Sequence, residues 1–84
     1  MPELGEIEDF LLKEASLIMK VEKQALVPET TFKELGLDSM ALLELLLSIE
    51  RKYGVQMLHA GLDAKDMRSF RSLAGRIARE LGEA

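Results

Sequence analysis

The chain has 84 residues, no cysteine, one histidine and a formal net charge of −4. Without cysteine it can form no disulfide framework, no cysteine zinc site and no thiol nucleophile, and His59 has no metal ligands at a suitable spacing. Residues 1–50 carry eleven acids and four bases, which disfavours binding to a phosphate backbone and suits a partner with a basic docking surface.

The length and the apolar fraction of 48% predict one folded domain over residues 1–84. No run of about 18 apolar residues occurs, so we expect no membrane span. The first nine residues are acidic, whereas a secretory signal peptide begins with basic residues. We therefore predict a monomeric, cytoplasmic domain that binds no nucleic acid.

Apolar residues recur at three- and four-residue spacing throughout the chain, which predicts an all-α fold. The first helix is expected from about Leu4 to Lys20. The long connection after it should be held to the core by Ala25, Leu26 and Val27, and should turn at Pro28.

A helical turn is expected within this connection. Thr31 and Glu34 are spaced as a capping box around Phe32, and Gly36 is placed to end the turn after Leu35.

The second long helix should begin at Asp38 or Ser39 and end near Tyr53, with Gly54 as its C-terminal stop. It is apolar over more than half of its circumference. The residues expected to face inward are Met40, Leu42, Leu43, Leu45, Leu46, Leu47, Ile49 and Tyr53. Glu44, Ser48 and Arg51 are expected to form its polar stripe.

The last helix should run from about Ser69 to Leu81, with Ser69 as its N-cap and Gly82 beyond its end. A short helix is expected before it, near Asp63–Met67. The solvated face of this part of the chain should carry Arg68, Arg71, Arg76 and Arg79. Together these elements predict a small antiparallel bundle of three long helices plus one short helix.

The most informative stretch is Gly36-Leu37-Asp38-Ser39-Met40. Taken alone it indicates helix capping, because Asp and Ser are both favoured at an N-cap. It also resembles the attachment site of the acyl carrier protein family, whose motif is Gly-x-Asp-Ser-[Leu/Met]. The resemblance covers nearly the whole chain, from the first amphipathic helix through the Phe-x-x-Leu-Gly turn to the final helix.

The resemblance implies an acyl-carrier-like four-helix bundle in which Ser39 carries a 4'-phosphopantetheine arm taken from coenzyme A. A phosphopantetheinyl transferase attaches the arm. Acyl groups would then be bound to the thiol of the arm as thioesters and presented to acyl-loading, condensing and acyl-transfer enzymes. Such a carrier is not itself an enzyme and needs no catalytic residue.

The resemblance also suggests roles for neighbouring residues. Asp38 is expected to cap the second helix, to contact a basic residue of the transferase, or to do both. Met40, Glu44 and Glu50 are expected to contact partner enzymes, and a solvated face is the competing interpretation of the two glutamates.

Two alternatives stay open at this point. One is a helical protein-interaction module that has the carrier fold but no prosthetic group. The other is a carrier whose load is an aminoacyl or aryl group rather than a fatty acyl group.

The second helix departs from the pattern of general fatty acid synthesis carriers, in which it is densely acidic. Ala41 stands where an acid is usual two residues after the serine, and Leu42 follows it. Arg51 and Lys52 stand near the helix end, where acids are usual. Basic residues there would repel a basic docking surface. We therefore expect a specialised carrier for a dedicated polyketide, lipid or envelope pathway.

Overall fold

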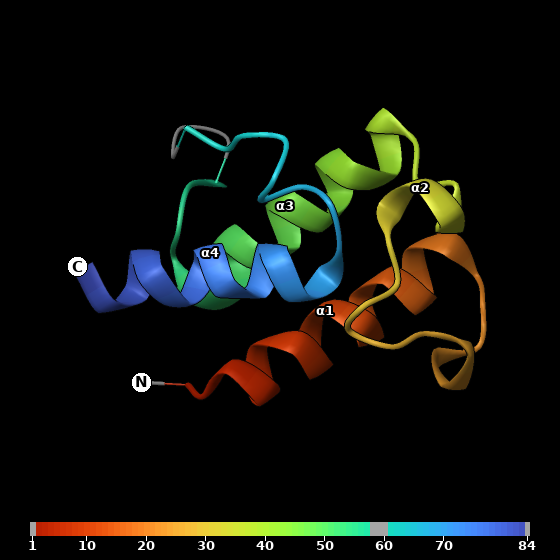
Figure 1. Cartoon of the computed structure of the whole chain (residues 1–84), viewed down its shortest axis with the longest axis horizontal. Helices are drawn as coiled ribbons and strands as arrows, with labels where there is room; N and C mark the ends of the chain where they lie inside the picture. The colour runs from red at the N-terminus through yellow and green to blue at the C-terminus, as the bar shows by residue number, and fades with distance from the viewer. Residues whose placement is uncertain (1, 58–60, 84) are drawn as a thin grey trace.

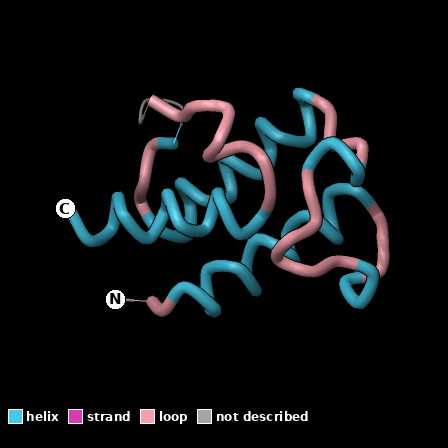
Figure 2. The backbone as a smooth tube through the Cα atoms, viewed as in Figure 1, coloured by secondary structure: helices cyan, strands magenta, loops and turns pink. Residues whose placement is uncertain are grey.

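The computed structural model describes residues 2–57 and 61–83, and every regular element within these ranges is a helix (Figure 1 and Figure 2). The three long helices are α1 (Leu4–Met19), α3 (Ser39–Tyr53) and α4 (Phe70–Glu83). A 3-10 turn, η1 (Lys23–Ala25), and a one-turn helix, α2 (Phe32–Leu35), lie between α1 and α3. The predicted all-α bundle is confirmed. None of the helices in the described part is long and apolar enough to cross a membrane.

Helix α1 packs against both α3 and α4 and thereby holds the bundle together (Figure 1). The apolar stripe predicted for α1 is on its inner face, where Ile7, Leu11 and Ala15 are fully buried. The other fully buried large side chains are Leu45, Ile49, Met57, Phe70, Leu73 and Ile77. The Cα radius of gyration is 11.6 Å, close to the roughly 12 Å expected for a packed chain of this length.

The connection between α1 and α2 is held by fewer apolar residues than predicted. Leu26 is buried, whereas Ala25 and Val27 are exposed. Val27 is the first residue of the turn at Pro28, which the Thr30 N–H closes by donating to the Val27 carbonyl at 2.9 Å. The turn at Pro28 itself is as predicted.

Helix α4 does not stop before Gly82, as expected from sequence, but continues through it to Glu83. A glycine ends a helix when it takes the left-handed conformation. That conformation is found at Gly36 and Gly54, which end α2 and α3 as predicted. Ser69 is the N-cap of α4, since its Oγ accepts from the Ser72 N–H at 3.2 Å.

The segment before α4, residues 61–69, forms turns and not the predicted short helix at Asp63–Met67. Asp63 accepts from the Asp66 N–H at 3.0 Å, and Asp66 accepts from the Asp63 N–H at 3.2 Å, which is the reciprocal pair that can start a helix. The Met67 N–H donates to the Asp63 carbonyl at 3.3 Å, but the turn is not continued. The next residues pair with another segment instead, since the Phe32 N–H donates to the Arg68 carbonyl and Ser69 bridges Thr31. The short helix of the fold is α2 instead, and His59 lies outside the described residues.

Candidate functional site

The chain enters the candidate site through α2, whose two ends are both capped. At its start, the Thr31 side chain accepts from the Glu34 N–H at 3.1 Å and the Glu34 side chain accepts from the Thr31 N–H at 2.7 Å. This reciprocal pair is the predicted capping box. At its end, Gly36 has a φ of 76°, which a residue with a Cβ rarely adopts.

Leu37 then fixes the direction in which the chain leaves α2. Its N–H donates to the Phe32 carbonyl at 3.0 Å, and the Gly36 N–H donates to the Lys33 carbonyl at 3.1 Å. These two bonds form the Schellman arrangement that closes a helix end. The side chain of Leu37 packs partly against the core, so Asp38 and Ser39 follow from a fixed point.

Asp38 is the N-cap of α3, and Ser39 is its first residue. The Asp38 carboxylate accepts from the Ala41 N–H at 2.8 Å, and its main-chain carbonyl accepts from the Leu42 N–H at 2.9 Å. From the sequence, either Asp38 or Ser39 could be the N-cap, and the structure assigns this role to Asp38. The Ser39 side chain is exposed at the helix start. There the first amides have no partner inside the helix and the dipole favours an anion.

The outward face of α3 is more apolar than predicted. Met40 is 65% exposed, Leu43 37% and Leu47 39%, although all three were expected to face inward. Ser48, expected in the polar stripe, is buried. Successive residues on a helix differ by about 100° of rotation, so Met40, Leu43 and Leu47 form one exposed apolar line that begins beside Ser39.

The charged residues of α3 lie on different sides of this line. Glu44 and Arg51 are exposed and flank a groove of about 310 Å³ between α1 and α3, together with Glu14, Ile18, Leu47 and Ser48. The Arg51 guanidinium donates to the Ser48 Oγ at 3.3 Å. Glu50 is half-buried. The Lys52 Nζ instead lies over the Phe10 ring on α1, 5.9 Å from its centroid.

Comparison with known protein families identifies the family of this chain. A family model described as "Phosphopantetheine attachment site" matches residues 9–58. The chain belongs to this family. The match confirms the resemblance to acyl carrier proteins and gives the chain a 4'-phosphopantetheine prosthetic group. It includes α2, the Asp38 cap and all of α3.

One curated relative supports the same assignment. Over 52 residues the chain is 38% identical to "Acyl carrier protein, mitochondrial" of Dictyostelium discoideum. The aligned part is 62% of this chain and 43% of the relative, so the chain spans less than half the length of that protein. No solved structure matches the chain.

The start of α3 fits the family's prosthetic group. The matched range contains three serines, all of them described. Ser48 is buried, and Ser16 is partly buried with its hydroxyl donating to the Lys13 carbonyl at 2.7 Å. Ser39 is the exposed one. When bound, the group supplies a thiol, which this cysteine-free chain otherwise lacks.

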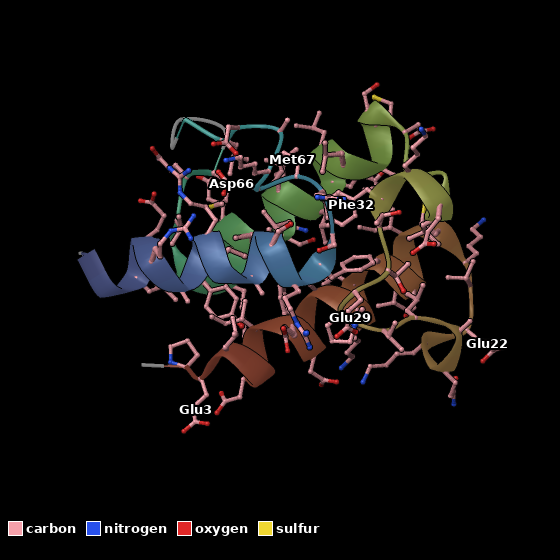
Figure 3. The ribbon with its side chains drawn as sticks, viewed as in Figure 1. Glu3, Glu22, Glu29, Phe32, Asp66 and Met67 are labelled. Carbon is pink, nitrogen blue, oxygen red and sulfur yellow. The ribbon has the colours of Figure 1, made fainter. Side chains whose placement is uncertain are left out.

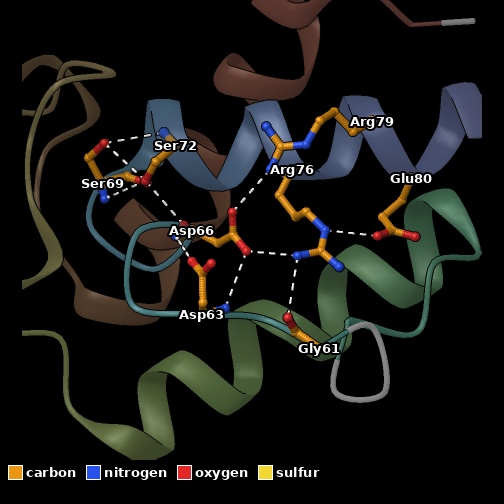
Figure 4. A network of polar contacts seen from close by, with 8 residues as sticks. All are labelled: Gly61, Asp63, Asp66, Ser69, Ser72, Arg76, Arg79 and Glu80. Carbon is orange, nitrogen blue, oxygen red and sulfur yellow. Dashed lines mark hydrogen bonds and ion pairs between the residues drawn. The ribbon is translucent and has the colours of Figure 1, made fainter.

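A second polar arrangement was not predicted and lies away from Ser39. We call it the Asp66 cluster; it consists of Asp63, Asp66, Arg76 and Arg79 (Figure 4). Asp66 is only 5% exposed. Its carboxylate accepts from Arg76 Nη1 at 2.8 Å and from Arg79 Nη2 at 3.2 Å.

Arg68, Arg71 and Arg79 are exposed, as expected for a solvated face, and the cluster corrects that expectation only for Arg76, whose side chain is 17% exposed. Arg76 and Arg79 bind Asp66, and Arg71 pairs with Glu8 and Glu29. Burial alone would raise the pKa of Asp66. The Asp63 N–H, the Arg76 hydrogen bond and the charges of both arginines outweigh burial and lower it instead. The sequence signal was the spacing of Arg76 and Arg79, which places both on one side of α4.

Proposed function

We propose that the chain is a carrier protein that holds its load as a thioester on a 4'-phosphopantetheine arm attached to Ser39. The observation that carries this is the exposed Ser39 hydroxyl at the start of α3, within the matched attachment-site family. In attachment, the Ser39 oxygen displaces adenosine 3',5'-bisphosphate from the pyrophosphate link of coenzyme A and loses its proton. The product is a phosphodiester on Ser39, and the helix start stabilises that anion. The relative's printed name supports an acyl load.

Intact mass spectrometry tests the assignment. The chain is incubated with coenzyme A and a phosphopantetheinyl transferase of broad specificity. We expect a mass increase of one phosphopantetheinyl group in the native protein. The Ser39→Ala variant should show none, and Ser16→Ala, which removes another serine of the matched range, should load normally. A loaded Ser39→Ala variant would show that the site is wrong.

The protein acts as a tethered substrate and not as a catalyst in this proposal. Transferase, acyl-loading, condensing and acyl-transfer enzymes are its proposed partners, and Met40 and Glu44 are proposed to contact them beside Ser39. Both side chains are exposed on α3, which supports this role. Glu50 is half-buried on the opposite flank of the apolar line and is proposed as a lesser contact.

The competing function is an interaction module without a prosthetic group, which the same mass experiment would reveal as an unmodified native protein. Within the carrier class, we propose a dedicated lipid, polyketide or envelope pathway over general fatty acid synthesis. Exposed Arg51 beside Glu44 supports this choice, since it interrupts the acidic surface that a basic docking patch would meet.

A further inference from the structure

Met40 is the most accessible methionine in the described part of the chain. It is 65% exposed, whereas Met57 is 1% exposed and belongs to the core. Met19 ends α1 and is partly buried. Met67, labelled in Figure 3 on the segment that leads into α4, is also partly buried. A dissolved oxidant therefore reaches the Met40 sulfur more readily than the other three.

The position of Met40 on α3 accounts for this exposure. Successive helical residues differ by about 100° of rotation, and Ala41, the next residue, is buried. Met40 is thereby turned away from the core, one residue after Ser39. It shares the exposed side of α3 with Leu43 and Leu47, so its thioether is part of the apolar line that begins beside the attachment serine.

A thioether is the most readily oxidised side chain in this sequence, because cysteine and tryptophan are absent. The methionine sulfur attacks the terminal oxygen of a hydroperoxide, and the O–O bond breaks. The sulfur is oxidised by two electrons and becomes a sulfoxide. The hydroperoxide is reduced and leaves as water or an alcohol, after the proton of the transferred OH has moved to the leaving oxygen.

This step would change the surface around Ser39 without changing the fold. A sulfoxide is polar, whereas Leu43 and Leu47 beside it offer only apolar surface. An enzyme that packs an apolar surface on this line would have to remove water from the sulfoxide oxygen, which is unfavourable. Met40 itself is exposed and is not part of the core, so the bundle should remain folded after oxidation.

We propose that Met40 is a site of reversible oxidation, at which a hydroperoxide forms the sulfoxide and thereby weakens docking of the enzymes that act on Ser39. The inference rests on the proposed carrier function and adds to it a chemical control of partner binding. Methionine sulfoxide reductases reverse the step. They reduce the sulfoxide with electrons from two thiols, and the products are the thioether, water and a disulfide.

Peptide mapping by mass spectrometry tests the site in the unmodified protein, which contains no thiol. After brief treatment with hydrogen peroxide, we expect one oxygen atom to be added at Met40 at least about tenfold faster than at Met57, and faster than at Met19 or Met67. The urea midpoint of the singly oxidised protein should equal that of the untreated protein. Equal rates at Met40 and Met57, or a lowered midpoint, would overturn the proposal.

Loading kinetics test the consequence for docking. The peroxide is removed before coenzyme A and the phosphopantetheinyl transferase are added. Oxidation at Met40 should raise the KM for loading by about threefold to tenfold, and methionine sulfoxide reductase should restore it. Met40→Leu has no sulfur at this position, so peroxide should leave its KM, whatever the value, unchanged. Met67→Leu is the matched control and should respond to peroxide as the native protein does.

The outcomes separate this inference from the carrier function. An unchanged KM in protein that is oxidised at Met40, or a peroxide response that persists in Met40→Leu, would overturn this inference alone. If the untreated protein accepts no arm, the carrier function fails and the docking part of the inference fails with it. Peptide mapping still decides in that case whether Met40 is the preferred site of oxidation.

Discussion

At the start of α3, Asp38 and Ser39 have different roles, which the sequence alone did not distinguish. Asp38 supplies the cap through its bond to the Ala41 N–H, and this leaves the Ser39 hydroxyl exposed and free of a structural duty. A modifiable hydroxyl can therefore stand at a helix start without weakening the helix. The sequence motif predicted both residues, but only the geometry assigns the cap to one of them.

Substitutions at the two positions should separate stability from loading. Ser39→Ala should change the free energy of unfolding by less than about 0.5 kcal/mol, as for an exposed site, and abolish loading. Asp38→Ala should cost about 0.5–2 kcal/mol because the cap is lost. Urea denaturation measures both. A Ser39→Ala variant that unfolds as readily as Asp38→Ala would contradict the assigned cap.

Asp38→Asn tests the second role expected of Asp38, contact with the transferase. Asn keeps an oxygen for the Ala41 N–H and remains a good N-cap, so stability should be nearly unchanged. If the carboxylate meets a basic residue of the transferase, the KM for loading should rise by roughly threefold or more and its salt dependence should weaken. Unchanged kinetics would leave Asp38 with the capping role only.

At the scale of elements, sequence predicted what is decided locally. The capping box at Thr31, the stop at Gly36 and the extent of α3 depend on residues within one or two turns of each other, and all three are confirmed. The exposure of Leu43 and Leu47 could not be predicted, because it depends on where α1 crosses α3.

The structure of residues 61–69 also depends on tertiary contacts, so the sequence could not predict it. At Asp63–Met67 the reciprocal bonds of Asp63 and Asp66 start only a single turn. Asp66 also accepts from Arg76 and Arg79 on α4, ten and thirteen residues further on. The spacing of Arg76 and Arg79 places both on one side of α4, but nothing in the sequence indicates that Asp66 is their shared partner. This pairing arises only when α4 is folded back beside the segment.

The junction between this segment and α4 should respond to acid. The folded pKa of Asp66 is lowered, so its contribution to stability is fully present above pH about 4, near the unfolded pKa, and is lost as pH falls through the folded pKa. Asp66→Asn should lower the unfolding free energy by about 1.5–3 kcal/mol at neutral pH. Its urea midpoint should fall less than that of the native protein as pH is lowered from neutral. Parallel pH profiles for the two proteins would contradict the lowered pKa.

In the whole molecule, ion pairs connect the acidic first part of the chain, residues 1–50, to the basic remainder, residues 51–84. The first fifty residues carry a balance of −7 and the rest +3, and ion pairs from Arg71 on α4 reach Glu8 on α1 and Glu29 after it. The three arginines of α4 are thus all paired with acids of the bundle, although Arg71 and Arg79 remain exposed. We therefore expect partner enzymes to contact the exposed face of α3, where Arg51 is an exposed cation near the apolar line.

Arg51 and Lys52 were expected to act together against a basic docking surface, but their positions differ. Arg51 lies about 20° of helix rotation from Glu44. Leu47 lies at the centre of the exposed face, and Lys52 is about 140° of rotation away from it. Lys52 rests over Phe10 instead. Only Arg51 should therefore decide whether enzymes of general fatty acid synthesis accept the carrier.

Loading and elongation by the host's general fatty acid synthase enzymes test this selectivity. We expect the native carrier to react slowly compared with the host's highly acidic carrier. Arg51→Glu should raise the rate by roughly threefold to tenfold at low salt, and added salt should shrink the gain, because a rim charge acts mainly on association. Lys52→Glu has the same charge change on the same helix and should give no gain. A native rate equal to that of the acidic carrier, or an equal gain from Lys52→Glu, would contradict a selective role for Arg51.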